Sequence, residues 1–140
     1  MQGLFLEDLS VGQTDALTYT VTEDTIVQFA EVSGDANPVH LDEAYAATTP
    51  FKGRIAHGML SAAYISAVLG TKLPGPGTVY MSQALRFMRP VRIGDVVTAR
   101  ATVSAIDTEK ARVTLETVCI VNDKPVLEGE AMVMVPRREG

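Results

Sequence analysis

The 140-residue chain lacks most of the residues that would indicate a disulfide-stabilised or metal-binding protein. It contains one cysteine, two histidines and no tryptophan. A single cysteine excludes an intrachain disulfide, and Cys119 falls in an expected strand, where we predict a core position rather than a reactive thiol. Two histidines and one cysteine, without an acidic cluster at ligand spacing, do not form the pattern of a metal site. We therefore expect no bound metal.

Long apolar runs and excess positive charge are also missing. The longest apolar-rich stretch, residues 59–69, contains two serines and is too short to span a bilayer. The first residues carry acids and no basic segment, so they do not resemble a signal peptide. We expect a cytoplasmic protein with no membrane partner. With a formal net charge of −5 we also expect no basic surface of the kind typical of nucleic-acid binding.

What is present describes an ordinary globular protein. Hydrophobic residues make up 46% of the chain and charged residues 21%. A chain of this length forms one domain by the usual expectation and is long enough to bury a sizeable core. We therefore predict a single domain over residues 1–140.

The spacing of apolar residues predicts helices in the first half of the chain and strands in the second. A strand is predicted at residues 16–21, followed by a helix that Thr22 caps and that ends near Ser33. Asp42 is expected to cap a short helix that runs through Ala47. Residues 58–70 are apolar or small on every side, which predicts a helix buried on every side and ended by Gly70. Short connections predict antiparallel pairing among the later strands, and so an α+β fold. Those strands are expected at residues 78–88, 95–106, 112–121 and 126–135.

The segment Ser33-Gly34-Asp35-Ala36-Asn37-Pro38 concentrates turn-forming residues, and His40 follows it closely. A loop so constrained could hold the carboxylate of Asp35 and the imidazole of His40 in a fixed geometry. Aspartate can accept a proton and histidine titrates near neutral pH, so a water held between them could be activated. The alternative is a helix-ending turn in which Asp35 caps a backbone amide and His40 is a polar surface residue. These two residues alone do not decide between the two.

The longer pattern Phe29-x-x-Val32-Ser33-Gly34-Asp35-x-Asn37-Pro38-x-His40 closely resembles the signature of the R-specific enoyl-CoA hydratases. These enzymes belong to the MaoC-like dehydratase group and have the hot-dog fold, a long central helix wrapped by an antiparallel sheet. The resemblance covers roughly residues 11–135 and is strongest to the small bacterial hydratases that supply (R)-3-hydroxyacyl-CoA for polyhydroxyalkanoate synthesis. It implies a homodimer, an acyl-CoA substrate and no cofactor other than the coenzyme A of that substrate.

The resemblance also implies roles for single residues. Asp35 and His40 match the catalytic pair, and Gly58 matches the glycine whose amide holds the thioester oxygen. Ser66 matches a serine near that pair, although a buried helical serine usually bonds a carbonyl of its own helix. His57 and Asn37 are candidate substrate-binding residues, and each has a structural alternative, ordering or shaping a turn. For Gly58 the structural alternative is a steric need for glycine.

Three arginines, Arg86, Arg89 and Arg92, could meet the phosphates of coenzyme A, but charges exposed at strand edges are the commoner case. Four functions stay open at this stage. The first is hydration of trans-2-enoyl-CoA to (R)-3-hydroxyacyl-CoA, which we favour. The others are a dehydratase acting on acyl-carrier-protein thioesters or functionalised acyl-CoA, a non-catalytic acyl-CoA-binding module, and a thioesterase.

Overall fold

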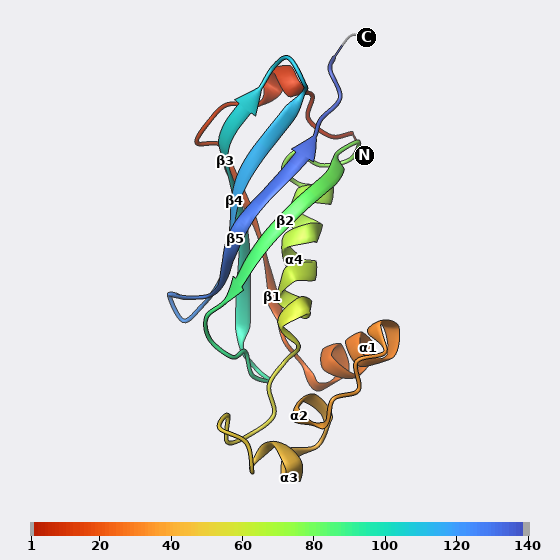
Figure 1. The fold of residues 1–140 in the computed structure, drawn as a ribbon, viewed down its shortest axis with the longest axis vertical. Coiled ribbons are helices and arrows are strands. Elements are labelled where there is room, and N and C mark those ends of the chain that lie inside the picture. The colour runs from red at the N-terminus through yellow and green to blue at the C-terminus, as the bar shows by residue number, and fades with distance from the viewer. Residues whose placement is uncertain (1, 139–140) are drawn as a thin grey trace.

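In the computed structural model, which describes residues 2–138, five strands form one antiparallel sheet in the order β1-β3-β4-β5-β2 (Figure 1). The predicted strands are confirmed to within two residues at each end. The predicted domain also includes residues 1, 139 and 140, which lie outside the described residues. The strands are β1 (Thr14–Thr20), β2 (Val79–Phe87), β3 (Val96–Asp107), β4 (Arg112–Val121) and β5 (Lys124–Met134).

Alternation along the central strands sets which face of the sheet is covered. Val103 and Leu115 are buried against the helix side, while Arg100 and Glu116 face outward and are exposed. The connection between β4 and β5 is a tight turn, in which Asn122 and its neighbour adopt positive φ, a conformation that Asn and Asp tolerate better than most residues.

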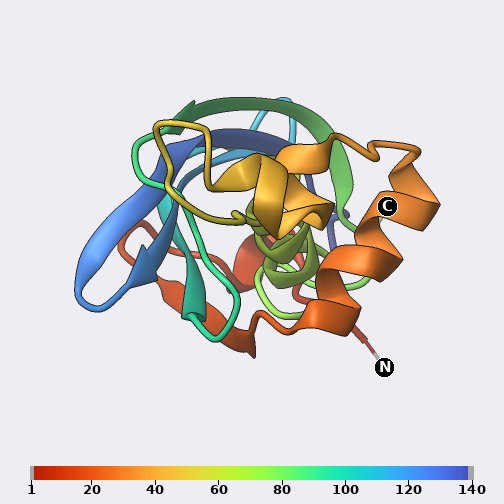
Figure 2. The same cartoon turned by 90° about the horizontal axis from the view of Figure 1, so that it is seen from below.

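The helix α4 (Gly58–Thr71) lies along the concave face of the sheet, and Figure 2 shows it end-on with the sheet curled around it. Its inward side carries large apolar residues, among them Tyr64, Ile65 and Val68, which pack into the core. This is the predicted hot-dog arrangement in an α+β fold.

The prediction that α4 is buried on every side is wrong for the single chain. Met59, Ala63, Ser66 and Gly70 recur every three or four residues, and all four are exposed. Gly70 also does not end the helix, which continues to Thr71. The sheet covers only one side of α4, so the apolar composition of the other side needs a separate explanation.

Three short elements form an overhang beyond the end of the sheet: α1 (Glu23–Ser33), α2 (Pro38–Leu41) and α3 (Glu43–Ala46) (Figure 1). Thr22 and Asp42 cap α1 and α3 as predicted, through hydrogen bonds of 3.1 and 3.2 Å from backbone amides. The helix α2 was not predicted. A short 3₁₀ turn, η1 (Leu6–Asp8), precedes β1.

Cys119 confirms its predicted place in the core. It is fully buried, its thiol donates to the carbonyl of Ser61 at 3.4 Å, and burial raises its pKa to about 12. A thiol with so high a pKa stays protonated and unreactive at neutral pH. None of the helices within residues 2–138 is long and apolar enough to cross a membrane.

Candidate active site

Asp35 lies in the loop between α1 and α2, one residue after Gly34 ends α1 with a φ of 80°. The Asp35 amide donates to Ser33 Oγ at 3.1 Å, and its Oδ1 accepts from the Asn37 amide at 3.2 Å. Asn37 in turn caps α2, because its Oδ1 accepts from the Val39 amide at 3.1 Å. Asn37 therefore shapes the turn, and no described residue bonds the second carboxylate oxygen of Asp35.

His40 lies on α2 and is buried. Its Nδ1 donates to the carbonyl of Ile55 at 2.8 Å, and because a carbonyl can only accept, the neutral ring carries its proton on Nδ1. Nε2 then has a free lone pair. Burial lowers the pKa of His40, and the nearby His57 lowers it too, while the Ile55 carbonyl and the charge of Asp35 oppose this. His40 is therefore a neutral base at neutral pH.

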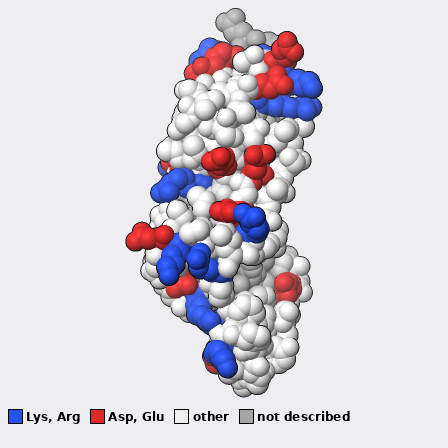
Figure 3. Space-filling view, turned by 60° about the vertical axis from the view of Figure 1, so that its left-hand side comes forward, with Lys and Arg blue, Asp and Glu red and all other residues white. Residues whose placement is uncertain are grey.

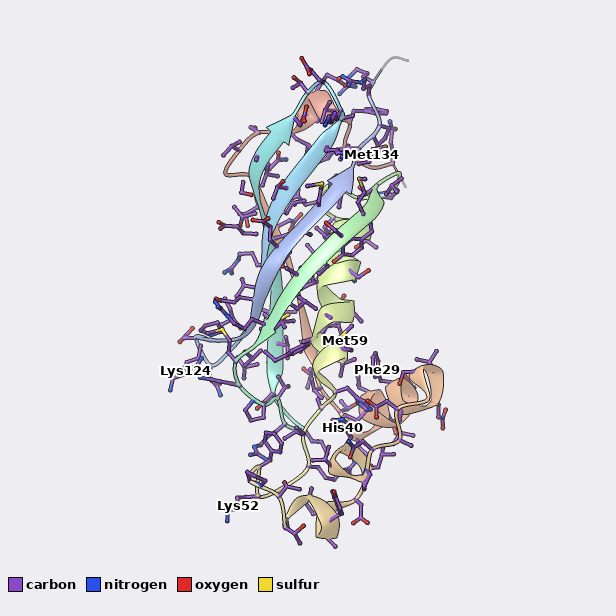
Figure 4. The ribbon with its side chains drawn as sticks, in the orientation of Figure 1. Phe29, His40, Lys52, Met59, Lys124 and Met134 are labelled. Atoms are coloured by element: carbon purple, nitrogen blue, oxygen red, sulfur yellow. The ribbon has the colours of Figure 1, made fainter. Side chains whose placement is uncertain are left out.

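His57 directly precedes α4, and the residue is only 2% exposed. Its Nε2 donates to the backbone carbonyl of Asp35 at 2.9 Å. The rings of His40 and His57 are stacked, with centroids 3.9 Å apart and planes 28° apart, and Phe29 packs on His57 at a tilt. Figure 4 shows Phe29 and His40 on the sides of α1 and α2 that face the start of α4.

Asp35, His40 and His57 converge: each places one carboxylate oxygen or ring nitrogen within 4.8 Å of the others. A water with two ordinary hydrogen bonds of about 2.8 Å holds its partners roughly 4.6 Å apart, so this spacing suits one bridging water. It suits a metal ion less well. Ring nitrogens bind a metal in the plane of the ring, and the two planes here run nearly parallel instead of meeting at one point.

Gly58 is the first residue of α4. Its amide precedes the i to i−4 hydrogen bonds of the helix and lies at the positive end of the helix dipole, where a developing negative charge is stabilised. A Cβ at this position would lie 2.6 Å from Cε1 of Phe87. The steric need for glycine is thus present alongside the free amide.

A mainly apolar cavity of about 480 Å³ adjoins the start of α4. His57, Gly58 and Ser61 form part of its wall, and Phe87 and Arg89 also line it. Asp35 and His40 are outside this wall. Gly58 therefore lines a cavity that can receive an extended, mostly apolar ligand, and it directly follows His57, which contacts Asp35 and His40.

The structure does not bring Ser66 to this site. It is exposed, not buried as expected, and lies roughly 12 Å further along α4 than Gly58, given a rise of about 1.5 Å per residue. Within one chain, Ser66 belongs to the exposed stripe of α4.

The three arginines do not form a free basic patch. Arg86 pairs with Glu128 at 2.5 Å, while Arg89 and Arg92 donate to the carbonyls of Pro125 and Phe51. Figure 3 shows charges of both signs interspersed on one face of the molecule. The arginines therefore act first as ties within the protein.

The sequence did not indicate a role for Arg54 at this site. Its Nε donates to the carbonyl of His40 at 2.7 Å, and its Nη1 pairs with Glu23 on α1 at 2.6 Å. It thereby fixes α2, which carries the imidazole, against α1. An arginine just before Ile55 gives no local signal of this, because both partners come from earlier elements.

The chain is similar to proteins of known function along almost its whole length. The family described as MaoC like domain matches residues 10–125. An (R)-specific enoyl-CoA hydratase of Rhodospirillum rubrum is 57% identical over 96% of this chain and 93% of its own. The R-hydratase PhaJ1 from Pseudomonas aeruginosa superimposes with a TM-score of 0.92 at 49% identity, covering 97% of this chain and 88% of that one.

An (R)-hydratase from A. caviae involved in PHA biosynthesis has a TM-score of 0.90 at 42% identity, over 93% of this chain and 99% of that one. The agreement thus extends through the overhang as well as the sheet. The chain belongs to the MaoC-like family.

Proposed function

We propose that this protein hydrates trans-2-enoyl-CoA to (R)-3-hydroxyacyl-CoA and catalyses the reverse dehydration. One observation carries the proposal: the Asp35 carboxylate converges with a buried, neutral His40 beside the free amide of Gly58. A proton acceptor, a water site and a donor for a thioester oxygen are the groups that this addition requires. The R-hydratases named above support the substrate and its handedness.

The reaction begins with a water held by Asp35 and His40. Nε2 of His40 removes one proton as the water oxygen bonds to the β-carbon, and the π electrons move onto the thioester oxygen. Asp35 accepts a hydrogen bond from the second hydrogen and stabilises the imidazolium. The Gly58 amide stabilises the enolate. Return of the proton from His40 to the α-carbon gives the 3-hydroxyacyl thioester and regenerates the neutral base.

The apolar cavity beyond Gly58 receives one arm of the substrate, because it starts where the thioester oxygen must sit. No cofactor takes part other than the coenzyme A of the substrate. Acyl-CoA is favoured over an acyl-carrier protein, since docking an acidic carrier calls for free basic groups and the three candidate arginines are bonded within the protein. Residues 1–140 act as one domain, in the cytoplasm, where acyl-CoA thioesters are formed and consumed.

The active form is a homodimer. No residue of β2 is buried, and its outer edge has no strand partner among the described residues. Val79, Tyr80 and Met81 on this edge are at least 40% exposed, beside the exposed stripe of α4. A second copy related by a two-fold axis would pair the two edges and cover both stripes. This also explains the apolar composition of the outer side of α4.

An assay with crotonyl-CoA and longer enoyl-CoAs as substrates tests the proposal. The decrease in enoyl absorbance, the concentration of free thiol and the chirality of the product should be measured on the same samples. We expect absorbance to fall without thiol release and the product to be R. A predominantly S product would refute the assignment. Release of free coenzyme A would identify a thioesterase. Binding of acyl-CoA without turnover would identify a non-catalytic module, and turnover of carrier-protein thioesters alone would identify the alternative dehydratase.

A further inference from the structure

His57 joins three parts of the site that come from different elements. Its backbone leads directly into Gly58 at the start of α4. Its Nε2 donates to the carbonyl of Asp35, and its ring stacks on His40. A single side chain thus links the core helix to both members of the acid–base pair.

The loop at residues 34–37 depends on this link. Its other hydrogen bonds are local: Asp35 bonds Ser33, Ala36 bonds Gly34, and Asn37 bonds Asp35. Among the described residues, the bond from His57 is the one long-range hydrogen bond that this exposed loop makes. Without it, the distance between the Asp35 carboxylate and the Gly58 amide would be set only through α1 and α2.

The ring of His57 has a fixed orientation and proton position. Because a carbonyl can only accept, Nε2 carries the proton. Nδ1 is buried, and no described residue offers it a hydrogen-bond partner. The ring therefore contributes one donor, held by a backbone carbonyl that exchanges no proton, and one flat face, which packs on the ring of His40.

We propose that His57 is a positioning residue, which holds the Asp35–His40 pair at the working distance from the Gly58 amide through its hydrogen bond to the Asp35 carbonyl. This inference rests on the proposed hydratase function and replaces the substrate-binding role expected from the sequence. Misplacing a reacting group by about 1 Å can cost on the order of 10²-fold in rate, so one such bond matters for turnover.

Three substitutions separate the hydrogen bond from the stacking. His57→Gln keeps an N–H donor close to the place of Nε2 but loses the ring, His57→Phe keeps a ring without the donor, and His57→Leu keeps neither. We expect His57→Gln to retain kcat within about tenfold, and His57→Phe and His57→Leu to lose on the order of 10²-fold. KM should stay within about threefold in all three, because no hydrogen bond or charge contact from the His57 side chain to the substrate is proposed.

Several results would overturn the inference. Equal losses in His57→Gln and His57→Phe would show that the donor is not what matters. A raised KM with normal kcat would indicate that His57 contacts the substrate. A lower Tm with normal kcat would indicate that His57 acts in folding alone. A pH profile of kcat that loses a limb in His57→Gln would make His57 a proton carrier.

Amide hydrogen exchange gives a readout that does not depend on activity. If His57 ties the loop, residues 34–37 should exchange faster in His57→Phe than in His57→Gln. Equal exchange in the two variants would refute the positioning role whatever the substrate proves to be. Failure of the natural protein to hydrate enoyl-CoA would instead refute the proposed function and leave the exchange result standing.

Discussion

Replacing Asp35 by asparagine tests the proposed chemistry with little change in shape. The substitution removes the negative charge that stabilises the imidazolium of His40 in the proposed mechanism. It keeps an Oδ1 that can accept the 3.2 Å hydrogen bond from the Asn37 amide. The loop that carries the residue should therefore hold its geometry.

The expected effects on stability and rate differ sharply. Asp35 is exposed, so neutralising it relieves little desolvation, and the free energy of unfolding should change by no more than about 0.5 kcal/mol. The rate should fall by on the order of 10²–10⁴, because His40 acts as the general base and loses the charge that stabilises its protonated form. His40→Ala should lose a similar factor. The double variant should lose much less than the product of the two, because the residues act as a unit.

Asp42→Asn is the matched control. Asp42 is also exposed, and its Oδ1 also accepts a backbone amide at 3.2 Å, from Tyr45, but it lies outside the converging groups. The kcat on crotonyl-CoA and the Tm should be measured on the same samples of both variants. A destabilised Asp35→Asn enzyme with full turnover, or equal losses of turnover in the two variants, would refute the catalytic role of Asp35.

Three further predictions follow from the same geometry. Gly58→Ala should lower kcat by on the order of 10²-fold with a smaller change in KM, since the new Cβ would lie 2.6 Å from the Phe87 ring and displace the helix start. Adding Phe87→Ala should restore much of the rate, and full activity of the single variant would contradict the expected displacement. Burial lowers the pKa of His40 from 6.5, so the acid limb of the kcat/KM profile should lie below pH 6.5, and a limb centred above pH 6.5 would contradict this. The free energy of unfolding should decline as the pH falls below 6.5, because the unfolded state binds the proton more readily than the folded state. Light scattering on the natural protein should give twice the 15.0 kDa chain mass, and an active natural monomer would contradict the proposed dimer. Ala63→Glu on the exposed stripe should yield inactive monomers.

The strands and the turn around Asp35 could be predicted from the sequence because their signals are local. Alternation along β3 and β4 fixes which residues face the core, and the turn residues at 107–110 and 122–124 fix their pairing. Thr22 and Gly34 mark the two ends of α1 by capping chemistry that does not depend on the rest of the fold.

Other features depend on which segments meet, and the sequence alone does not contain that information. Four residues of α2 are too few for a periodic signal, so His40 was expected in a loop. An apolar helix predicts burial but not what covers it, which is why the prediction of burial was wrong for the exposed side of α4, Ser66 included. The contacts of Arg54 and His57 join residues up to 31 positions apart.

The two halves of the site rest on supports of different strength. Gly58 begins a helix whose inner side is packed in the core, while Asp35 and His40 belong to the overhang, where few residues are buried. The overhang is joined to the rest mainly by residues 54–57, through Arg54, the carbonyl of Ile55 and His57. Sparse burial predicts that the overhang opens at a lower free energy than the sheet unfolds. Such an opening would move Asp35 and His40 away from the Gly58 amide while the core stays folded, and the contacts of residues 54–57 would oppose it.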